Sequence, residues 1–333
     1  MRCRPCLRLR LVVRCVRFWR LSMAGTIADF FGYRADDASL VASETAARNI
    51  CPFIHDTCTK RLGRDGSISG VCAIKQISSP DRIICCPNRL YANGYKILKI
   101  IARKTFGYEY NLYAGRAAVA KAIREGGAVA VYGHRWGGEL RLPKRDGSGN
   151  YFADWVLARL DESGVLQEFT SIEVQTIDTT GNYRSSRESL LRDRSITKST
   201  VGLNWENVSK RIIPQLVYKG QVLQREPLCK SGLWFVTPET VYQRIIERLG
   251  GEENMAFGYS PQPGALHFLR YDYVDDNCSD GCPTKLEVIG EGCTTVEQVQ
   301  SAFNRVRLPE PGVYGKALQE ALYGRDAVFE SER

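Results

Sequence analysis

The 333-residue sequence has no uninterrupted apolar run of the roughly 20 residues that a membrane-spanning helix needs. We also expect no secretory leader, because residues 1–22 contain seven arginines that interrupt every apolar stretch. No segment of the sequence repeats along the chain. These absences disfavour membrane, secreted and repeat proteins. They favour a globular protein in a reducing compartment, without a membrane partner.

Acidic residues are absent from the first 22 residues and scarce in one later segment. The formal net charge is +9, yet the chain from Met23 onward has 39 basic and 37 acidic residues. Residues 181–230 contain ten Lys or Arg and only four Asp or Glu. A basic segment in a near-neutral body favours a phosphate-contacting surface, and a solvated surface without a partner is the alternative.

Residues 1–22 have the character of a non-native or disordered extension, and Met23 is the expected start of the folded protein. The alternative is a basic arm that binds DNA. Beyond it, hydrophobic periodicity predicts a mixed α/β protein. Helices are predicted at residues 35–49, 91–106, 114–125, 202–220, 241–249 and 316–322, with Pro214 kinking or breaking the fourth. Strands are predicted at residues 128–132, 139–142, 151–160, 165–177 and 233–236.

Four of the twelve cysteines follow the spacing C-x6-C-x13-C-x13-C in a turn-rich segment; they are Cys51, Cys58, Cys72 and Cys86. Thiolates at the corners of such a segment are typical of a tetrahedral site for zinc or a single iron. The spacing lacks a CxxC knuckle, so buried free cysteines are the alternative. Cys85 competes with Cys86 as a ligand, although the two would point in opposite directions in extended chain.

Cys278, Cys282 and Cys293 form a second group, with or without Cys229. Their spacing permits another site, but unpaired thiols are the favoured interpretation.

The most informative stretch runs from Tyr151 to Asp178 and predicts a β-hairpin closed by the turn DESG. With Leu160 opposite Val165, Asp154 lies opposite Ser171. Alternation then places Ser171, Glu173 and Gln175 on one face with Asp154, and Ile172 and Val174 on the other, apolar face.

Two carboxylates and an amide on one face are suitable oxygen ligands for Mg²⁺, which can acidify a water for attack on a phosphodiester. The spacing D-x18-E-x-Q is the nuclease pattern PD-(D/E)-x-K with glutamine in the last place. Gln175 can orient a water but cannot act as a base near neutral pH. The pattern alone is common by chance, and a solvated hairpin face is the alternative.

Several motifs, in their order along the chain, resemble the NotI family of type II restriction endonucleases. They are CPF (51–53), GVC (70–72), CPNRLYAN (86–93), FGY (106–108), GGEL (137–140), DWVLARL (154–160), EVQTIDTTGNYR (173–184) and GLNWENVSKRIIPQ (202–215). The resemblance covers roughly residues 27–236. It is closer to EagI than to NotI itself.

The resemblance implies a PD-(D/E)xK restriction-endonuclease-like core at residues 111–333 behind a four-cysteine metal-binding module at residues 23–110. It implies structural iron at the four cysteines, with zinc as the alternative. Asp154, Glu173 and Gln175 match the family's catalytic positions, and Glu139 matches a further acidic position. Asp154 and Glu173 are the expected Mg²⁺ ligands. Residues 1–22 have no counterpart in the family, and Cys85 is a departure from it.

The expected function is Mg²⁺-dependent double-strand cleavage of a GC-rich palindrome, CGGCCG or GCGGCCGC, leaving 5′ overhangs. A palindrome favours a homodimer. The family further implies a bacterial cytoplasmic enzyme whose host carries a cognate DNA methyltransferase. The candidate DNA contacts are Asn182, Arg184, Arg187, Lys198, Asn207, Lys210, Arg211 and Gln215. The alternatives are a zinc-finger-type DNA-binding regulator without catalysis and a repair or phage-defence nuclease of loose specificity.

Overall fold

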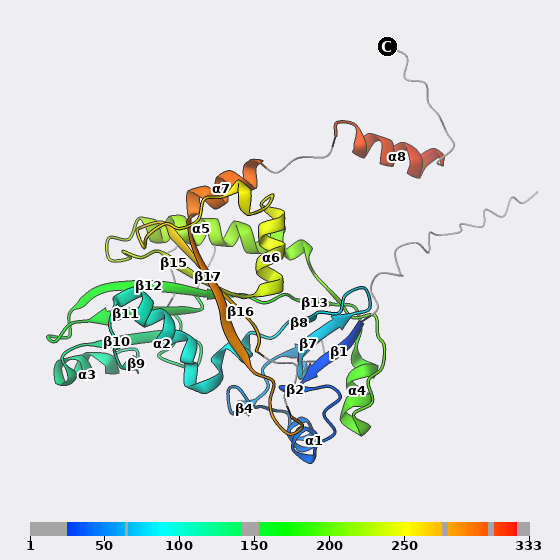
Figure 1. The fold of residues 1–333 in the computed structure, drawn as a ribbon, viewed down its shortest axis with the longest axis horizontal. Coiled ribbons are helices and arrows are strands. Elements are labelled where there is room, and N and C mark those ends of the chain that lie inside the picture. The colour runs from blue at the N-terminus through cyan, green and yellow to red at the C-terminus, as the bar shows by residue number, and fades with distance from the viewer. Residues whose placement is uncertain (1–24, 64–65, 141–152, 275–278, 306–309, 325–333) are drawn as a thin grey trace, which may run out of the picture.

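The computed structural model describes residues 25–63, 66–140, 153–274, 279–305 and 310–324. The predicted extension at residues 1–22 and Cys278 therefore lie outside the described residues. The described part of the chain has two main sheets, which lie on different sides of the molecule in Figure 1. None of its helices combines the length and apolar character needed to cross a membrane.

The larger sheet has seven strands in the order β17-β16-β15-β12-β11-β10-β9. Their bounds are β9 Leu112–Ala114, β10 Ala128–Gly133, β11 Trp155–Leu160, β12 Leu166–Val174, β15 Leu233–Pro238, β16 Ala265–Tyr273 and β17 Leu286–Thr295. β12, β15 and β16 run parallel to one another, as do β9 and β10, while the other neighbours are antiparallel. The fold is therefore mixed α/β, as the sequence predicts.

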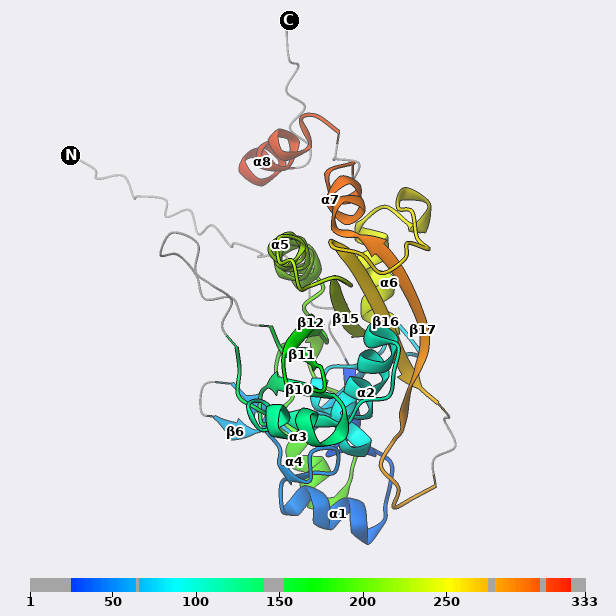
Figure 2. The same ribbon diagram turned by 90° about the vertical axis from the view of Figure 1, so that its left-hand side faces the viewer.

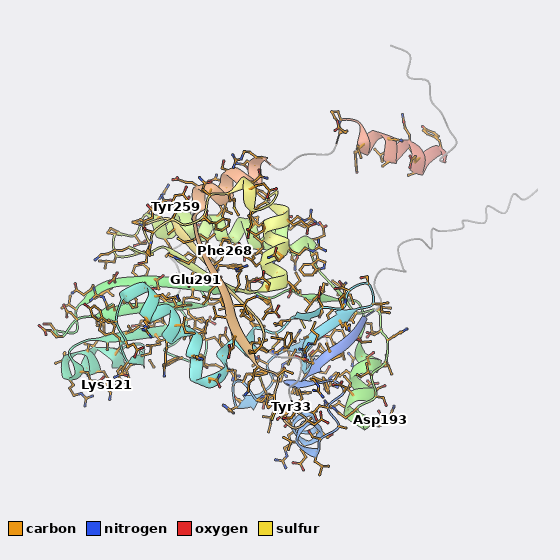
Figure 3. All side chains as sticks on the ribbon, in the orientation of Figure 1. Tyr33, Lys121, Asp193, Tyr259, Phe268 and Glu291 are labelled. Carbon is orange, nitrogen blue, oxygen red and sulfur yellow. The ribbon has the colours of Figure 1, made fainter. Side chains whose placement is uncertain are left out.

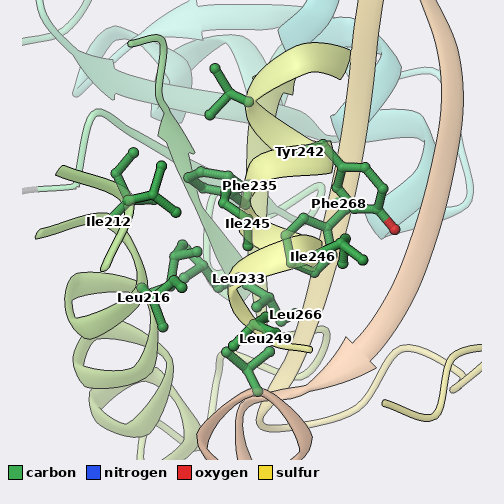
Figure 4. Packing of buried hydrophobic residues seen from close by; sticks show 14 of the residues in the cluster. Ile212, Leu216, Leu233, Phe235, Tyr242, Ile245, Ile246, Leu249, Leu266 and Phe268 are labelled. Carbon is green, nitrogen blue, oxygen red and sulfur yellow. The ribbon is translucent and has the colours of Figure 1, made fainter. Parts of the chain in front are cut away.

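Helices cover both faces of this sheet because its central strands carry apolar side chains on both faces. Their bounds are α2 Ala92–Phe106, α3 Ala117–Glu125, α5 Ile213–Gln224, α6 Glu239–Arg248 and α7 Val296–Arg305. In β15, Leu233 and Phe235 pack against α5 and α6, as Figure 4 shows, whereas Trp234 packs against α2 on the opposite face. The sheet is therefore the middle of three layers. Helices α3, α5 and α6 lie on one face of the sheet, and α2 lies on the other.

The smaller, N-terminal sheet has the order β2-β1-β7-β8, with three two-stranded ribbons beside or beyond it. The bounds of its strands are β1 Gly25–Phe30, β2 Tyr33–Arg34, β7 Val71–Gln76 and β8 Arg82–Ile84. The three ribbons are β3 Ile50–Cys51 with β4 Asp56–Thr57, β5 Arg61–Leu62 with β6 Ser67–Ile68, and β13 Thr179–Thr180 with β14 Gly202–Leu203. Helices α1 (Leu40–Ala47) and α4 (Arg184–Asp193) pack on this part. Figure 3 labels Asp193 at the end of α4, on the opposite side of the view from Lys121 of α3.

Short helical turns and one separate helix complete the fold. They are η1 Pro87–Tyr91, the π-helical turn η2 Val208–Ile212, η3 Glu252–Asn254 and α8 Val313–Tyr323. Helix α8 buries none of its residues and stands apart from the rest of the protein in Figures 1 and 2.

Most predicted elements are confirmed, and three are wrong in detail. The helix predicted at residues 202–220 begins later, because Gly202–Leu203 is strand β14; the break predicted at Pro214 is absent, because the π-helical turn η2 runs directly into α5, with Ile212 and Ile213 both in the right-handed helical conformation and Pro214 in the first turn of α5. Glu139 and Leu140 lie outside any strand, and the rest of the strand predicted at 139–142 is outside the described residues. The third correction concerns the hairpin register.

Candidate active site

The predicted β-hairpin exists as β11 and β12, but its register differs from the prediction. Val156 pairs with Ser171, the partner predicted for Asp154. The reason is the turn: the Asp161 carboxylate accepts hydrogen bonds from the backbone N–H groups of Ser163 and Val165, both at 2.9 Å. Val165 therefore belongs to the turn, and Leu160 pairs with Leu166 instead. An irregularity between Arg159 and Leu160 adds a second residue to the displacement, so that Arg159 pairs with Glu168. A displacement of two residues preserves alternation, so Glu173 keeps the face predicted for it.

Asp154, immediately before β11, and Glu173, near the end of β12, come together at the edge of the α5 layer. The Oδ2 atom of Asp154 accepts a hydrogen bond from the backbone N–H of Val174 at 2.8 Å. Glu173 is buried, and the backbone N–H of Asp154 contributes to lowering the pKa of its carboxyl group. Ile172 and Val174 face the opposite way, into the core under α2, as predicted.

The two carboxyl groups affect each other's ionisation. Burial, and then the nearby charge of Asp154, raise the pKa of Glu173 to about 7. The pKa of Asp154 is also raised, because surrounding protein desolvates its carboxyl group; the charge of Glu139 adds a smaller effect in the same direction. Partly desolvated carboxylates that share one site disfavour their own charged forms unless a cation joins them.

One cation of the chain itself reaches this pair, and the sequence prediction missed it. Lys219, on α5, is buried, and its Nζ atom lies 2.6 Å from Oε1 of Glu173. Its charge lowers the pKa of both Glu173 and Asp154, opposing the effect of burial. The available signal was its position on α5: Lys219 lies between Leu216 and Leu223 on the buried face of the helix, where a charge needs a partner.

Gln175, the last residue of the predicted pattern, is half-buried and bonded locally. Its Nε2 atom donates to the backbone carbonyl of Thr176 at 2.6 Å. Its own backbone N–H donates to the carbonyl of Val236, which ties the end of β12 to β15. The side-chain amide is thus directed at its own chain.

Glu139 approaches the site from the loop after β10. The loop turns back through Gly137, whose φ is 82° and where a Cβ atom would lie 2.0 Å from the carbonyl oxygen of Val131. Only glycine fits that turn. Glu139 is exposed, and its Oε1 atom lies 3.4 Å from Nδ1 of His134. Its charge contributes to the raised pKa of Asp154, so the loop brings a third carboxylate near the pair.

Aromatic rings support this loop from the α2 side. Trp136 packs on Tyr95 with ring centroids 5.1 Å apart, and Tyr95 packs on Trp155 at 5.4 Å. Because Trp155 directly follows Asp154, the stack links the loop that carries Glu139 to the strand that positions Asp154.

The four predicted cysteines lie in one buried cluster beneath the N-terminal sheet. Cys51 belongs to β3, Cys58 follows β4, Cys72 belongs to β7 and Cys86 follows β8. Burial raises the pKa of Cys51 to about 11 and also raises that of Cys58. A hydrogen bond between Cys72 and Cys86 raises the pKa of Cys72 and lowers that of Cys86.

Cys85 takes a different environment from its neighbour. Its Sγ atom lies 3.1 Å from Nζ of Lys60, which also donates to the Cys85 carbonyl at 2.8 Å. The charge of Cys86 raises the pKa of Cys51, Cys58 and Cys72, and that of Cys85 as well, so it is the Lys60 contact that distinguishes Cys85 from the other four.

Among the residues that the structure describes, no three or more His, Cys, Asp or Glu side chains have the arrangement of a metal site. This holds both for the four cysteines and for the Asp154–Glu173 pair. In the second cysteine group, Cys229 is buried and hydrogen-bonded to the carbonyl of Gly232, while Cys282 is exposed and Cys293 half-buried.

The candidate DNA contacts fall into two groups. Asn182, Arg184, Arg187 and Lys198 surround α4, beside the N-terminal sheet. Asn182 accepts a hydrogen bond from the backbone N–H of Arg184 at 3.0 Å, and half-buried Arg187 donates to the Ser69 carbonyl at 3.1 Å. Arg187 therefore ties α4 to the N-terminal part, while Lys198 is exposed.

The second group lies at the start of α5 and contains Asn207, Lys210, Arg211 and Gln215. Asn207 donates to Oδ2 of Asp178 at 2.9 Å, and Arg211 lies 3.7 Å from the same atom. Asp178 follows β12, so these side chains are held next to the strand that carries Glu173. Lys210 pairs with Glu206 at 3.5 Å, and Gln215 is exposed.

Comparison with known families gives one match: the family described as restriction endonuclease NotI matches residues 31–230. The matched span is more than half of the 333-residue chain and includes Glu139, Asp154, Glu173, Lys219 and the four clustered cysteines. No curated protein matches the chain.

Proposed function

Because the chain belongs to the NotI family of restriction endonucleases, and is thus a site-specific deoxyribonuclease that binds double-stranded DNA, we propose that it uses Mg²⁺ and cuts both strands of a GC-rich palindrome. The observation that carries this proposal is the meeting of Asp154 and Glu173 at the end of the β11–β12 hairpin, inside the family match. We place the nuclease core at residues 111–333.

The donor set suits a hard divalent cation. Glu173 is buried beside a second carboxylate, and Lys219 offsets only one of the two charges. Asp154 and Glu173 would hold Mg²⁺, with Glu139 assisting from its loop. When bound, Mg²⁺ supplies charge neutralisation at the phosphate and an acidified water.

The protein's own residues then position the reaction. Asp154 is fixed by the Val174 N–H, and Glu173 is held by its ion pair with Lys219, so both carboxylates have defined orientations. A water oxygen attacks phosphorus, one bridging P–O bond breaks, and the departing oxygen takes its electron pair and a proton. The water's proton passes to solvent.

We propose that the N-terminal part, residues 23–110, is a structural metal module with iron, or alternatively zinc, at Cys51, Cys58, Cys72 and Cys86. Support comes from their burial in one cluster and from the electrostatic influence of Cys86 on the other three. Buried thiols favour their neutral form in the absence of a cation, and a bound cation reverses that preference. Cys85, paired with Lys60, is not proposed as a ligand.

For DNA recognition we propose a homodimer that places one active site on each strand. Arg184, Lys198, Lys210 and Arg211 are candidate contacts to guanine or phosphate, and Asn182, Asn207 and Gln215 are candidate amide contacts. Arg187 is proposed to act indirectly on DNA binding, because its hydrogen bond to the Ser69 carbonyl holds α4 in position. The proposed site is CGGCCG, with GCGGCCGC as the longer form. The shorter form is proposed on the resemblance to EagI expected from residues 86–93 and 202–215. We propose four-base 5′ overhangs, a bacterial cytoplasmic location and a cognate host methyltransferase.

A digest of a sequenced plasmid with Mg²⁺, followed by run-off sequencing of the ends, tests this function. Discrete fragments with ends at a central GGCC are expected. Ends without GGCC would refute the proposed specificity, and a strict eight-base requirement would favour the longer site. A smear or structure-specific nicks would favour a nuclease of loose specificity, and binding without cleavage would favour a regulator.

A further inference from the structure

Lys219 is a buried cation on the internal face of α5. Its side chain is 9% exposed, and the residues one turn before and after it, Leu216 and Leu223, are buried in the core. Burying an ammonium group is costly unless it is paired. The partner is Glu173 on β12, whose Oε1 atom lies 2.6 Å from Nζ of Lys219, a close ion pair.

The proposed catalytic pattern itself has no cation. Glutamine stands at position 175, and its amide is bonded to the Thr176 carbonyl on its own strand. The ammonium group of Lys219, in contrast, lies 2.6 Å from Oε1 of Glu173, whose strand neighbour Val174 donates its backbone N–H to Asp154. A positive charge is therefore present in the site, but it comes from α5, where Lys219 lies 44 residues after position 175.

We propose that Lys219 is the catalytic lysine of this nuclease site, supplying from α5 the charge that position 175 lacks. This inference rests on the proposed function. An ammonium group has three N–H donors, so Lys219 can contact the attacking water and a phosphate oxygen while it keeps its ion pair with Glu173. The charge stabilises the negative charge that develops on phosphate oxygens during attack.

A purely structural role gives different expectations. If Lys219 only compensated the charge of Glu173 until Mg²⁺ arrived, its removal would lower stability but leave cleavage at saturating Mg²⁺ nearly unchanged. As a catalytic residue, its removal lowers the rate of cleavage in the bound complex. A lysine introduced at position 175 then restores activity, because residues 173 and 175 lie on the same face of the strand.

The test compares Lys219→Met with wild type in the full chain. Single-turnover cleavage of a plasmid is measured at saturating Mg²⁺, and DNA binding is measured separately by fluorescence anisotropy in Ca²⁺. The expected result is a cleavage rate at least about 100-fold lower, with a dissociation constant for DNA within about threefold of wild type. Gln175→Lys added to Lys219→Met should recover at least about tenfold of the rate.

The matched control is Lys104→Met. Lys104 on α2 makes an ion pair of similar length, 2.7 Å, with Glu291 of β17, away from the carboxylate pair. This variant should cut at the wild-type rate. Lys219→Gln, which retains a hydrogen-bonding group, replaces the methionine variant if that variant does not fold, and the same losses and the same recovery are expected.

Cleavage by Lys219→Met within threefold of wild type would overturn the inference, as would absence of any recovery on adding Gln175→Lys. Equal losses of DNA binding and cleavage would also overturn it, since they indicate a structural role. The wild-type protein separates this failure from that of the proposed function: a wild type that makes no cuts refutes both, whereas normal cutting by wild type and Lys219→Met refutes only the role of Lys219.

Discussion

The guanidinium group of Arg89 lies 2.8 Å from the carboxylate of Asp29, and both side chains are fully buried. Arg89 also donates to the hydroxyl oxygens of Tyr273 and Thr284. Asp29 lies on β1, in the N-terminal sheet, and Tyr273 is the last residue of β16 in the larger sheet. Arg89 therefore joins the two main sheets through one buried polar cluster.

Arg89→Met should destabilise the protein strongly, because it removes the nearer guanidinium partner of the buried Asp29 carboxylate and leaves only that of Arg82, at 3.8 Å. We expect a loss of about 3–5 kcal/mol in the free energy of unfolding, measured by urea denaturation. The control is Arg103→Met, whose pair with Glu109 is exposed at 2.9 Å and should contribute less than about 1 kcal/mol. Equal effects of the two substitutions would refute this role of Arg89.

The cysteine cluster predicts a metal content and a set of substitutions that remove it. The purified protein should contain about one iron or zinc per chain. Cys51→Ser or Cys72→Ser should lose the metal and lower the unfolding temperature, since metal binding is coupled to folding. Cys85→Ser should retain the metal, and so should the control Cys229→Ser, which is buried in a different core. A metal-free protein of unchanged stability would contradict the proposal.

The carboxylate pair predicts that cleavage and binding can be separated. Glu173→Gln or Asp154→Asn should lower the single-turnover cleavage rate at least about 100-fold, because each removes a charged metal ligand. Specific DNA binding, measured in Ca²⁺-free buffer, should persist. The control is Glu162→Gln, an exposed residue in the turn of the same hairpin. Near-normal cutting by either variant would refute the assignment.

The apolar pattern of the chain was enough to predict the face of β12 but not its pairing. Ile172 and Val174 alternate with polar residues, so burial of one face fixed the direction of Glu173. The register depended instead on the Asp161 side chain, which draws Val165 into the turn. Such a side-chain-to-backbone bond competes with strand pairing and carries no hydrophobic periodicity.

Lys219 could not be assigned from local sequence because its partner is distant in the chain. The contact with Glu173 arises only when α5 packs on the β12–β15 part of the sheet. The same reasoning applies to Arg89, whose partners Asp29, Tyr273 and Thr284 come from three separate segments. Strand and helix positions follow from short-range periodicity, whereas polar pairs between layers require the tertiary arrangement.

The burial of His267 predicts how the free energy of unfolding depends on pH. It stacks on Trp234, its Nε2 atom lies 2.7 Å from the Ser231 carbonyl, and burial lowers its pKa below the usual 6.5. In the unfolded chain the imidazole binds a proton more readily, so its contribution to stability is present above pH 6.5 and is lost as pH falls towards the folded-state pKa.

In urea denaturation between pH 7.5 and pH 5, His267 should therefore contribute a decline in the free energy of unfolding of at most about 1.4 kcal/mol per pH unit, opposite in sign to the contribution of Glu173, whose pKa is raised to about 7. His267→Gln should show a shallower decline than wild type. His55→Asn, at an exposed position, serves as the control and should retain the wild-type slope. Identical slopes for wild type and His267→Gln would contradict this role of His267.

The last prediction separates base reading from phosphate contact at the start of α5. Asp178 holds Arg211 and Asn207 next to the strand that carries Glu173, so this group is placed to meet DNA near the cleaved bond. If Arg211 reads a guanine, Arg211→Ala should weaken binding to the proper site by about 1–3 kcal/mol and relax the preference at one base pair. If it contacts phosphate, binding to all sequences should weaken alike. The slope of log affinity against log salt concentration should then become shallower by about one. Anisotropy titrations against the proper site and single-base variants, at several salt concentrations, distinguish the two.

Arg103→Ala, in an exposed pair with Glu109 on another surface, is the control. Unchanged affinity and unchanged salt dependence of Arg211→Ala would exclude this end of α5 from the DNA interface.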